Sequence, residues 1–232
     1  MDSAQQRNFW NRHIQEWSVS AYENSKDVSF IERIAQPWRK HLRWREEMAA
    51  EIVSNWEPSS VVELGCGTGG FATALLRNSR TIRRYDAFDI SESAIATARD
   101  RIGLLGLGQN VKVTVEASSV EDLDPKRFRD FDSVVGLGLI PYLTDTGFEK
   151  LASICQGKSF LFDYHPREAT IFNGIHFVYR KVKGYPFYRM FTEPELAETM
   201  AHFGFGKYEL IRRGPLRFTR SLQPASPAVP VA

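Results

Sequence analysis

The sequence is poor in the features that mark several classes of protein. Its 232 residues include only two cysteines, Cys66 and Cys155, which excludes a framework of disulfide bonds and suits a reducing compartment. No apolar run approaches the roughly 20 residues that a membrane-spanning helix needs. The first residues also lack the basic start and apolar stretch of a signal peptide. These absences favour a soluble, cytoplasmic protein with no membrane partner.

The chain also lacks a large excess of charge of one sign. It has 30 Lys and Arg against 28 Asp and Glu, for a formal net charge of +2. This balance is too weak to indicate a nucleic-acid partner from bulk electrostatics. With 43% hydrophobic residues the chain can bury a core, and its length fits one domain of an α/β protein.

Three regions differ in composition. Residues 1–57 are rich in aromatic and charged residues, and their apolar positions recur at helical spacing, so we expect an N-terminal helical lid. Residues 58–222 alternate short β-branched runs with helical patterns, which predicts βαβ units and a doubly wound, mostly parallel sheet. Residues 223–232 contain three prolines and little to bury, so we expect a disordered tail.

Several local signals place the elements of the central region. The strand-like runs begin near positions 61, 85, 111, 133 and 159. Ser91 is a candidate N-cap for a helix whose apolar face ends near three glycines. Thr192 and Glu195 have the spacing of a capping box, and the two extended segments that follow, 207–212 and 216–222, predict an antiparallel pair.

A strand, a glycine turn and a helix follow one another at residues 61–76. Gly65, Gly67 and Gly70 satisfy the dinucleotide fingerprint G-x-G-x-x-G, in which the helix N-terminus receives a pyrophosphate. Glu63, however, lies two residues before the first glycine, and a carboxylate there would oppose a pyrophosphate. It favours a cationic ligand with an ammonium and a sulfonium group, namely S-adenosylmethionine. Asp89, 24 positions after Gly65, is spaced to accept hydrogen bonds from ribose hydroxyls.

At these residues the chain resembles the class I S-adenosylmethionine-dependent methyltransferases. Residues 63–69 (ELGCGTG) resemble their first motif, residues 88–91 (FDIS) their second, and residues 131–135 (FDSVV) the strand before their active-site loop. The resemblance covers about residues 57–222 and implies a Rossmann-like, seven-stranded sheet with a reversed C-terminal strand. The cofactor-binding positions that it implies are Glu63, Gly65, Cys66, Gly67, Gly69, Asp89, Ile90, Ser119, Val120 and Leu137.

One of these positions departs from the family pattern. Members often have an acid after the third strand, close to the adenine amino group, where this chain has Ser119. A hydroxyl group can still form a hydrogen bond to the base. The departure changes the expected contact with the adenine amino group and leaves the expected cofactor unchanged.

The loop after the fourth strand, residues 136–142, is expected to border the transferred methyl group. It has Pro141 and Tyr142, but Leu139 and Ile140 offer no side-chain acceptor, so a nucleobase amine is disfavoured as substrate. The segment also resembles magnesium-protoporphyrin methyltransferases, which have a histidine at the position of Pro141. The closer resemblance is to bacterial small-molecule methyltransferases, including the quinone-pathway type.

Candidate catalytic residues are His165, just after the fifth strand, and Tyr142. Histidine can accept a proton near neutral pH. Tyr22, Tyr142 and His176 are candidate substrate-binding residues. Three of these residues have a structural interpretation as well: His165 ends the strand, Tyr142 forms a pocket wall, and His176 packs within an inserted strand.

Residues 166–190 form an insertion in which aromatic residues alternate with Lys and Arg, and a second basic run lies at residues 33–45. The insertion suits a lid over an aromatic or anionic small molecule, and an ordinary packed flap or RNA stacking also gives this pattern. The basic run suits either a solvated helix face or attraction of an anionic substrate. No His, Asp or Glu cluster has the spacing of metal ligands.

The sequence therefore predicts methyl transfer from S-adenosylmethionine to a small molecule, at an oxygen. The alternatives are a regulatory protein that binds S-adenosylmethionine without catalysis and a methyltransferase that acts on RNA or protein.

Overall fold

The computed structural model describes residues 5–12, 14, 30–108, 110–168 and 188–222. Tyr22, His176, most of the 166–190 insertion and the 223–232 tail lie outside these residues. Residues 5–12 form a short helix, here called the N-terminal helix. The longer helices are α2 (Phe30–Ser54), α3 (Gly70–Asn78), α4 (Glu92–Gly103), α5 (Asp145–Cys155) and α7 (Glu193–His202). Single turns of 3-10 helix are η1 (Val120–Asp122), η2 (Pro125–Phe128) and η3 (Ile140–Tyr142).

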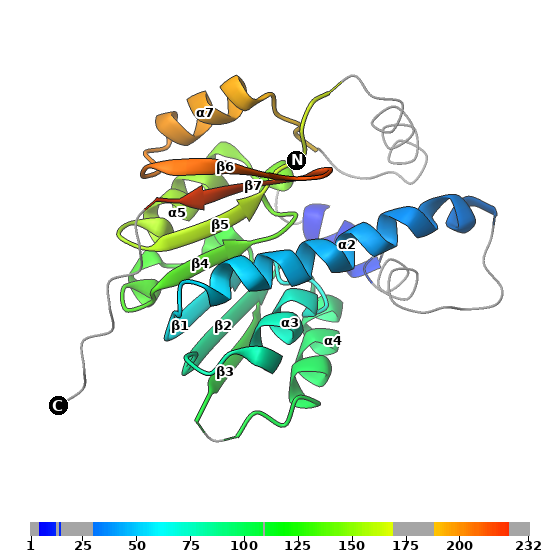
Figure 1. Cartoon of the computed structure of the whole chain (residues 1–232), viewed down its shortest axis with the longest axis vertical. Coiled ribbons are helices and arrows are strands. Elements are labelled where there is room, and N and C mark those ends of the chain that lie inside the picture. The colour runs from blue at the N-terminus through cyan, green and yellow to red at the C-terminus, as the bar shows by residue number, and fades with distance from the viewer. Residues whose placement is uncertain (1–4, 13, 15–29, 109, 169–187, 223–232) are drawn as a thin grey trace.

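Seven strands form one sheet in the order β3-β2-β1-β4-β5-β7-β6 (Figure 1). They are β1 (Ser60–Leu64), β2 (Arg84–Asp89), β3 (Lys112–Ala117), β4 (Ser133–Gly136), β5 (Ser159–Asp163), β6 (Tyr208–Arg213) and β7 (Leu216–Ser221). The first five strands in this order are parallel to one another, and β7 is antiparallel to both β5 and β6. The doubly wound sheet with a reversed C-terminal strand is confirmed.

Helices cover both faces of the sheet, so its central strands are buried on both sides. Val61 belongs to a core shared with α2, α3 and α4, whereas Val62 and Leu64 belong to a core shared with α5 and α7. Every residue of β1 is buried. This explains why the strand is apolar from Val61 onward except at Glu63, as is usual for a buried parallel strand.

The helix signals in the sequence are confirmed by the caps that the structure forms. The Ser91 side chain accepts a hydrogen bond from the Ala94 amide at the start of α4. Thr192 and Glu195 form a reciprocal capping box at the start of α7. These side chains satisfy amide groups that have no partner within the helix.

The C-terminal half of α2 belongs to the core. Ala49, Ala50 and Val53 are buried with residues of β1 and α3, and α2 packs against α3. Figure 1 shows α2 crossing in front of the sheet toward the edge where the parallel strands end. α2 therefore brings its side chains to that edge.

Chain order reverses between β1 and β4, which neighbour each other at the centre of the sheet. From β1 the chain continues to β2 and β3 on one side, and from β4 to β5 on the other. Sheets of this kind bind ligands at such a switch point, outside the carboxyl ends of the strands. The candidate site is therefore built from the segments that follow β1, β2, β4 and β5.

Candidate active site

The glycine loop between β1 and α3 adopts a backbone conformation that favours glycine. Gly65, Gly67 and Gly69 have φ angles of 74°, 52° and 79°. A Cβ at Gly69 would lie 3.3 Å from the Cα of Ala98 in α4, whereas a Cβ at Gly67 would have no atom within 4 Å. Gly69 thus permits close packing of two helices, and Gly67 faces open space in which a ligand can approach the backbone.

Asp89, the last residue of β2, holds this loop in place. Its Oδ2 accepts a hydrogen bond of 2.8 Å from the Gly67 amide, and its Oδ1 accepts one of 2.9 Å from the Ser91 amide. Burial raises the pKa of the Asp89 carboxyl group, and these amides oppose the shift. Two carboxylate oxygens have about four lone pairs, so Asp89 retains acceptor capacity for a ligand.

Glu63 lies in β1 directly before the loop and is 2% exposed. The hydroxyl of Tyr85 in β2 donates a hydrogen bond to its Oε2. Burial raises the pKa of Glu63 to about 8, and the nearby carboxylates of Glu46 and Asp89 contribute to the shift. The site therefore gathers carboxyl groups beside the glycine loop. A cationic group of a ligand would favour the ionised form of Glu63, whereas a pyrophosphate would disfavour it.

Two adjacent residues of α2 also reach this edge. The Glu46 carboxylate packs over Gly70, the first residue of α3, where a Cβ would lie 2.3 Å from its oxygens. Arg45 Nη1 forms an ion pair of 2.9 Å with Asp163 Oδ2 at the end of β5. Sequence reasoning treated Arg45 as part of a basic run and did not single out Glu46. The sequence gives one weak indication of these two residues: they are charged positions in a helical pattern that directly precedes β1.

The loop after β4 lies against the glycine loop. A Cβ at Gly65 would lie 3.4 Å from Leu139 Cδ1. Leu137 is buried in the core with β1. The predicted cofactor contact of Leu137 stays a prediction, and Leu139 is a neighbour of the glycine loop that sequence reasoning missed.

Tyr142, at the end of this loop, lies within a row of aromatic rings. Its ring centroid lies 5.3 Å from that of Trp10 in the N-terminal helix and 5.2 Å from that of Tyr188. The His165 ring lies 5.6 Å from Tyr188. The two predicted catalytic residues, Tyr142 and His165, therefore both contact Tyr188. They lie in the segments that follow the neighbouring strands β4 and β5. Trp10 also belongs to the row, which the sequence did not predict.

The N-terminal helix spans the ends of several strands. The Ser91 hydroxyl donates to Asn11 Oδ1 at 2.9 Å, and Arg7 lies 3.7 Å from Asp122, after β3. Gln6 donates to the backbone carbonyl of Tyr142 at 3.1 Å. These contacts place the helix along the predicted cofactor site, from the end of β2 to the end of β4.

The remaining predicted cofactor residues have clear local roles. Cys66 is buried, and burial raises the pKa of its thiol. The Ser119 hydroxyl accepts from the Glu121 amide at 3.3 Å and so caps η1, while the Val120 side chain packs in the core. Ile90 is half-buried beside Asp89. Their ligand contacts stay predictions.

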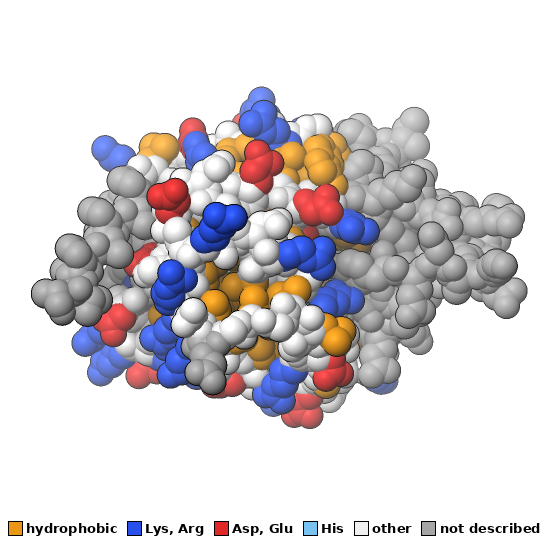
Figure 2. All heavy atoms as spheres, turned by 60° about the horizontal axis from the view of Figure 1, so that its bottom comes forward, with side chains coloured by type: hydrophobic (Ala, Val, Ile, Leu, Met, Phe, Trp, Pro, Cys, Tyr) orange, Lys and Arg blue, Asp and Glu red, His pale blue; other side chains and the backbone are white. Residues whose placement is uncertain are grey.

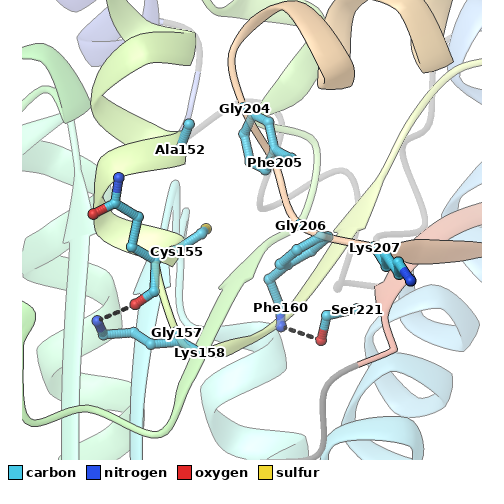
Figure 3. A pocket seen from close by; sticks show the side chains of 11 residues that line it. Ala152, Cys155, Gly157, Lys158, Phe160, Gly204, Phe205, Gly206, Lys207 and Ser221 are labelled. Atoms are coloured by element: carbon cyan, nitrogen blue, oxygen red, sulfur yellow. Dashed lines mark hydrogen bonds between the residues drawn. The ribbon is translucent and has the colours of Figure 1, made fainter.

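A small pocket of about 150 Å³ lies elsewhere, where β5 begins (Figure 3). Two of its polar contacts are within the protein: Lys158 Nζ donates to the Gln156 carbonyl at 3.2 Å, and the Phe160 amide donates to Ser221 Oγ at 2.9 Å. Ligand pockets usually measure about 300–1,000 Å³. This hollow is therefore a poor candidate for the predicted chemistry.

The part of the chain that the structure describes has neither a group of metal ligands nor a membrane-spanning helix. Within the ranges listed above, no three His, Cys, Asp or Glu side chains are grouped so that they could hold a metal ion. None of the helices described there has the length and apolar character to cross a membrane.

Comparisons with known proteins agree with this geometry. A family model described as a methyltransferase domain matches residues 62–155. The malonyl-[acyl-carrier protein] O-methyltransferase of Brevibacillus brevis is 29% identical over 94 residues, which are 40% of this chain and 33% of that protein. The match spans about a third of the relative's length.

Solved structures share the fold over more of the chain. Magnesium protoporphyrin IX methyltransferase from Synechocystis gives a TM-score of 0.69 at 16% identity, covering 95% of this chain and 98% of that one. A putative O-methyltransferase from Nostoc punctiforme gives 0.64 at 12% identity, covering 93% and 69%. A small-RNA methyltransferase gives 0.59 at 18% identity, covering 79% and 26%.

The Gly69→Ala substitution tests the packing of the glycine loop. It is expected to destabilise the protein by about 1–3 kcal/mol, because alanine would need a left-handed backbone at φ 79° and would press on Ala98. Gly103→Ala is the matched control: a Cβ there would meet nothing within 4 Å. Urea unfolding measures both, and equal stabilities of the two variants would contradict this account of the loop.

Proposed function

We propose that this chain is a class I S-adenosylmethionine-dependent methyltransferase that transfers the methyl group of S-adenosylmethionine to an oxygen of a small molecule. The match of residues 62–155 to a family model described as a methyltransferase domain supports the proposal. The observation that carries the proposal is the buried Glu63 carboxyl group beside a glycine loop with open space at Gly67. The ammonium group of the ligand is placed at Glu63 and its ribose at Asp89. When bound, the cofactor supplies a methyl carbon on a positive sulfur.

The chain's own part in the reaction is alignment. The bound cofactor would supply the methyl group, with its sulfur as the leaving atom, and the residues of the site would hold the acceptor oxygen opposite that sulfur. The protein has to hold the acceptor oxygen, the methyl carbon and the sulfur in line and to exclude water. The loop after β4 and the row of Trp10, Tyr142 and Tyr188 form the wall on which the acceptor is placed.

An oxygen of a small molecule is preferred over a nucleic acid for two reasons. The similar proteins include an O-methyltransferase of a malonyl-carrier substrate and a porphyrin methyltransferase. On the face drawn in Figure 2, both Lys and Arg and Asp and Glu side chains are present. A small-RNA methyltransferase shares the fold, so RNA belongs in the test.

A transfer assay tests the function directly. The protein is incubated with S-adenosylmethionine labelled in its methyl group and with panels of carboxylic acids, phenols and short RNAs. We expect the label in a small-molecule ester or ether; mild base releases it as methanol only from an ester. Label in RNA, or no transfer to any panel despite tight cofactor binding, would contradict the proposal.

Proton release on binding tests the placement of Glu63. In the free protein its pKa is raised to about 8, so at pH 7 the group holds a proton. A neighbouring ammonium group stabilises the carboxylate and lowers this pKa, so binding releases about one proton and affinity rises as the pH increases toward 8.

Titration with S-adenosylhomocysteine in phosphate and in Tris measures this release, because the two buffers differ in ionisation enthalpy. The apparent binding enthalpies should differ for the wild-type protein and agree for Glu63→Gln. Equal enthalpies for the wild-type protein would place the ammonium group elsewhere.

His165→Ala tests the proposed base. If His165 accepts the acceptor's proton, turnover falls by about 100-fold or more while cofactor affinity is unchanged. The control is His202→Ala, an exposed histidine in the last turn of α7. Near-normal turnover of His165→Ala would remove this residue from the mechanism and point to an acceptor that is already ionised, such as a carboxylate.

A further inference from the structure

A single carboxylate joins three parts of the candidate site. Asp163, the last residue of β5, accepts a hydrogen bond from the Gly138 amide through Oδ1. Through Oδ2 it forms the 2.9 Å ion pair with Arg45 of α2, 118 positions earlier in the sequence. The two side chains are only 14% and 15% exposed. Such a buried, hydrogen-bonded pair fixes geometry more firmly than a surface ion pair.

The backbone hydrogen bonds of the sheet stop just before this point. The last register pair between β4 and β5 joins Gly136 to Phe162. On its other side β5 stays anchored, because Asp163 itself pairs with Phe218 of β7. Asp163 is therefore a fixed point, and its side chain continues the connection to the loop beyond the end of the ladder.

The loop is shaped for this contact. Gly138 has a φ of 71°, and a Cβ there would lie 3.4 Å from Arg45 Nη1. The next residue, Leu139, is the one that lies against Gly65 of the glycine loop. A shift of Gly138 would thus be transmitted both to the cofactor loop and to Tyr142 at the end of the same segment.

We propose that Asp163, acting together with Arg45, is a positioning residue that holds the 137–142 loop in register with the glycine loop. The inference rests on the proposed function, because this loop is the one placed beside the transferred methyl group. Neither residue needs to touch the acceptor. Their effect is on alignment, and displacements of about 1 Å can cost up to about 100-fold in rate.

Amide hydrogen exchange tests the proposal without an acceptor. In the complex with S-adenosylhomocysteine, Asp163→Asn and Arg45→Met should speed exchange of the Gly138 amide at least about tenfold, because each removes part of its anchor. Exchange in β1 should not change. Arg45→Lys should restore part of the protection, since it keeps the charge but loses the planar fork.

Arg43→Met is the matched control on the same helix. Arg43 forms an exposed ion pair with Glu47, with 72% and 56% of the side chains exposed, so its loss should leave the loop unchanged. If Arg45→Met fails to fold, Asp163→Asn and Arg45→Lys carry the test. The affinity for S-adenosylhomocysteine should stay within about threefold in all variants.

The outcomes separate the inference from the proposed function. Unchanged exchange at Gly138 in Asp163→Asn and Arg45→Met would overturn the inference. A loss of affinity without faster exchange would also overturn it, because Arg45 would then be a cofactor ligand. If the wild-type protein does not bind S-adenosylhomocysteine, the proposed function fails, and the same exchange comparison on the free protein still decides the role of Asp163.

With an acceptor identified, the same variants should lower kcat and leave the KM for S-adenosylmethionine unchanged. Because a loss of folded protein would also lower the apparent kcat at an unchanged KM, kcat is calculated per molecule that binds S-adenosylhomocysteine. A parallel loss in Arg43→Met would contradict a specific positioning role.

Discussion

The hydrogen bond from the Gly67 amide to the Asp89 carboxylate is the interaction on which the candidate site depends. It ties the turn after β1 to the end of β2, and the second oxygen of the same carboxylate fixes the start of α4 through the Ser91 amide. The residue expected to hold the ribose therefore also shapes the loop around the ligand. Replacing Asp89 would disturb the loop as well as ligand binding, so loss of affinity alone cannot identify a direct contact.

The N-terminal part of the chain has a larger role than that of a cover. Ala49 and Val53 of α2 complete the core beside β1, and the same helix brings Arg45 and Glu46 to the ends of the strands. The Glu46 carboxylate then lies over Gly70, beside the glycine loop, and the Arg45 guanidinium group lies against Gly138 in the loop after β4. The electrostatic character of the site thus depends on a helix that precedes the matched methyltransferase domain.

Local patterns in the sequence were sufficient for the fold. Strand runs, the Ser91 cap and the capping box at Thr192 are set by neighbours within a few residues, and Glu63 marks the glycine loop because a charge interrupts an apolar run. Long-range pairs were not accessible in this way. Nothing in the sequence joins Arg45 to Asp163, because their contact arises only when α2 crosses the sheet.

The carboxyl groups beside the glycine loop should select a ligand with a cationic group over a dinucleotide. Calorimetric titration of the wild-type protein and of Glu63→Gln with S-adenosylmethionine, S-adenosylhomocysteine and NAD measures this selectivity. We expect the wild-type protein to bind the first two ligands, Glu63→Gln to bind them more weakly, and neither protein to bind NAD. If the wild-type protein bound NAD alone, or if Glu63→Gln had unchanged affinities, Glu63 would not set the choice of ligand.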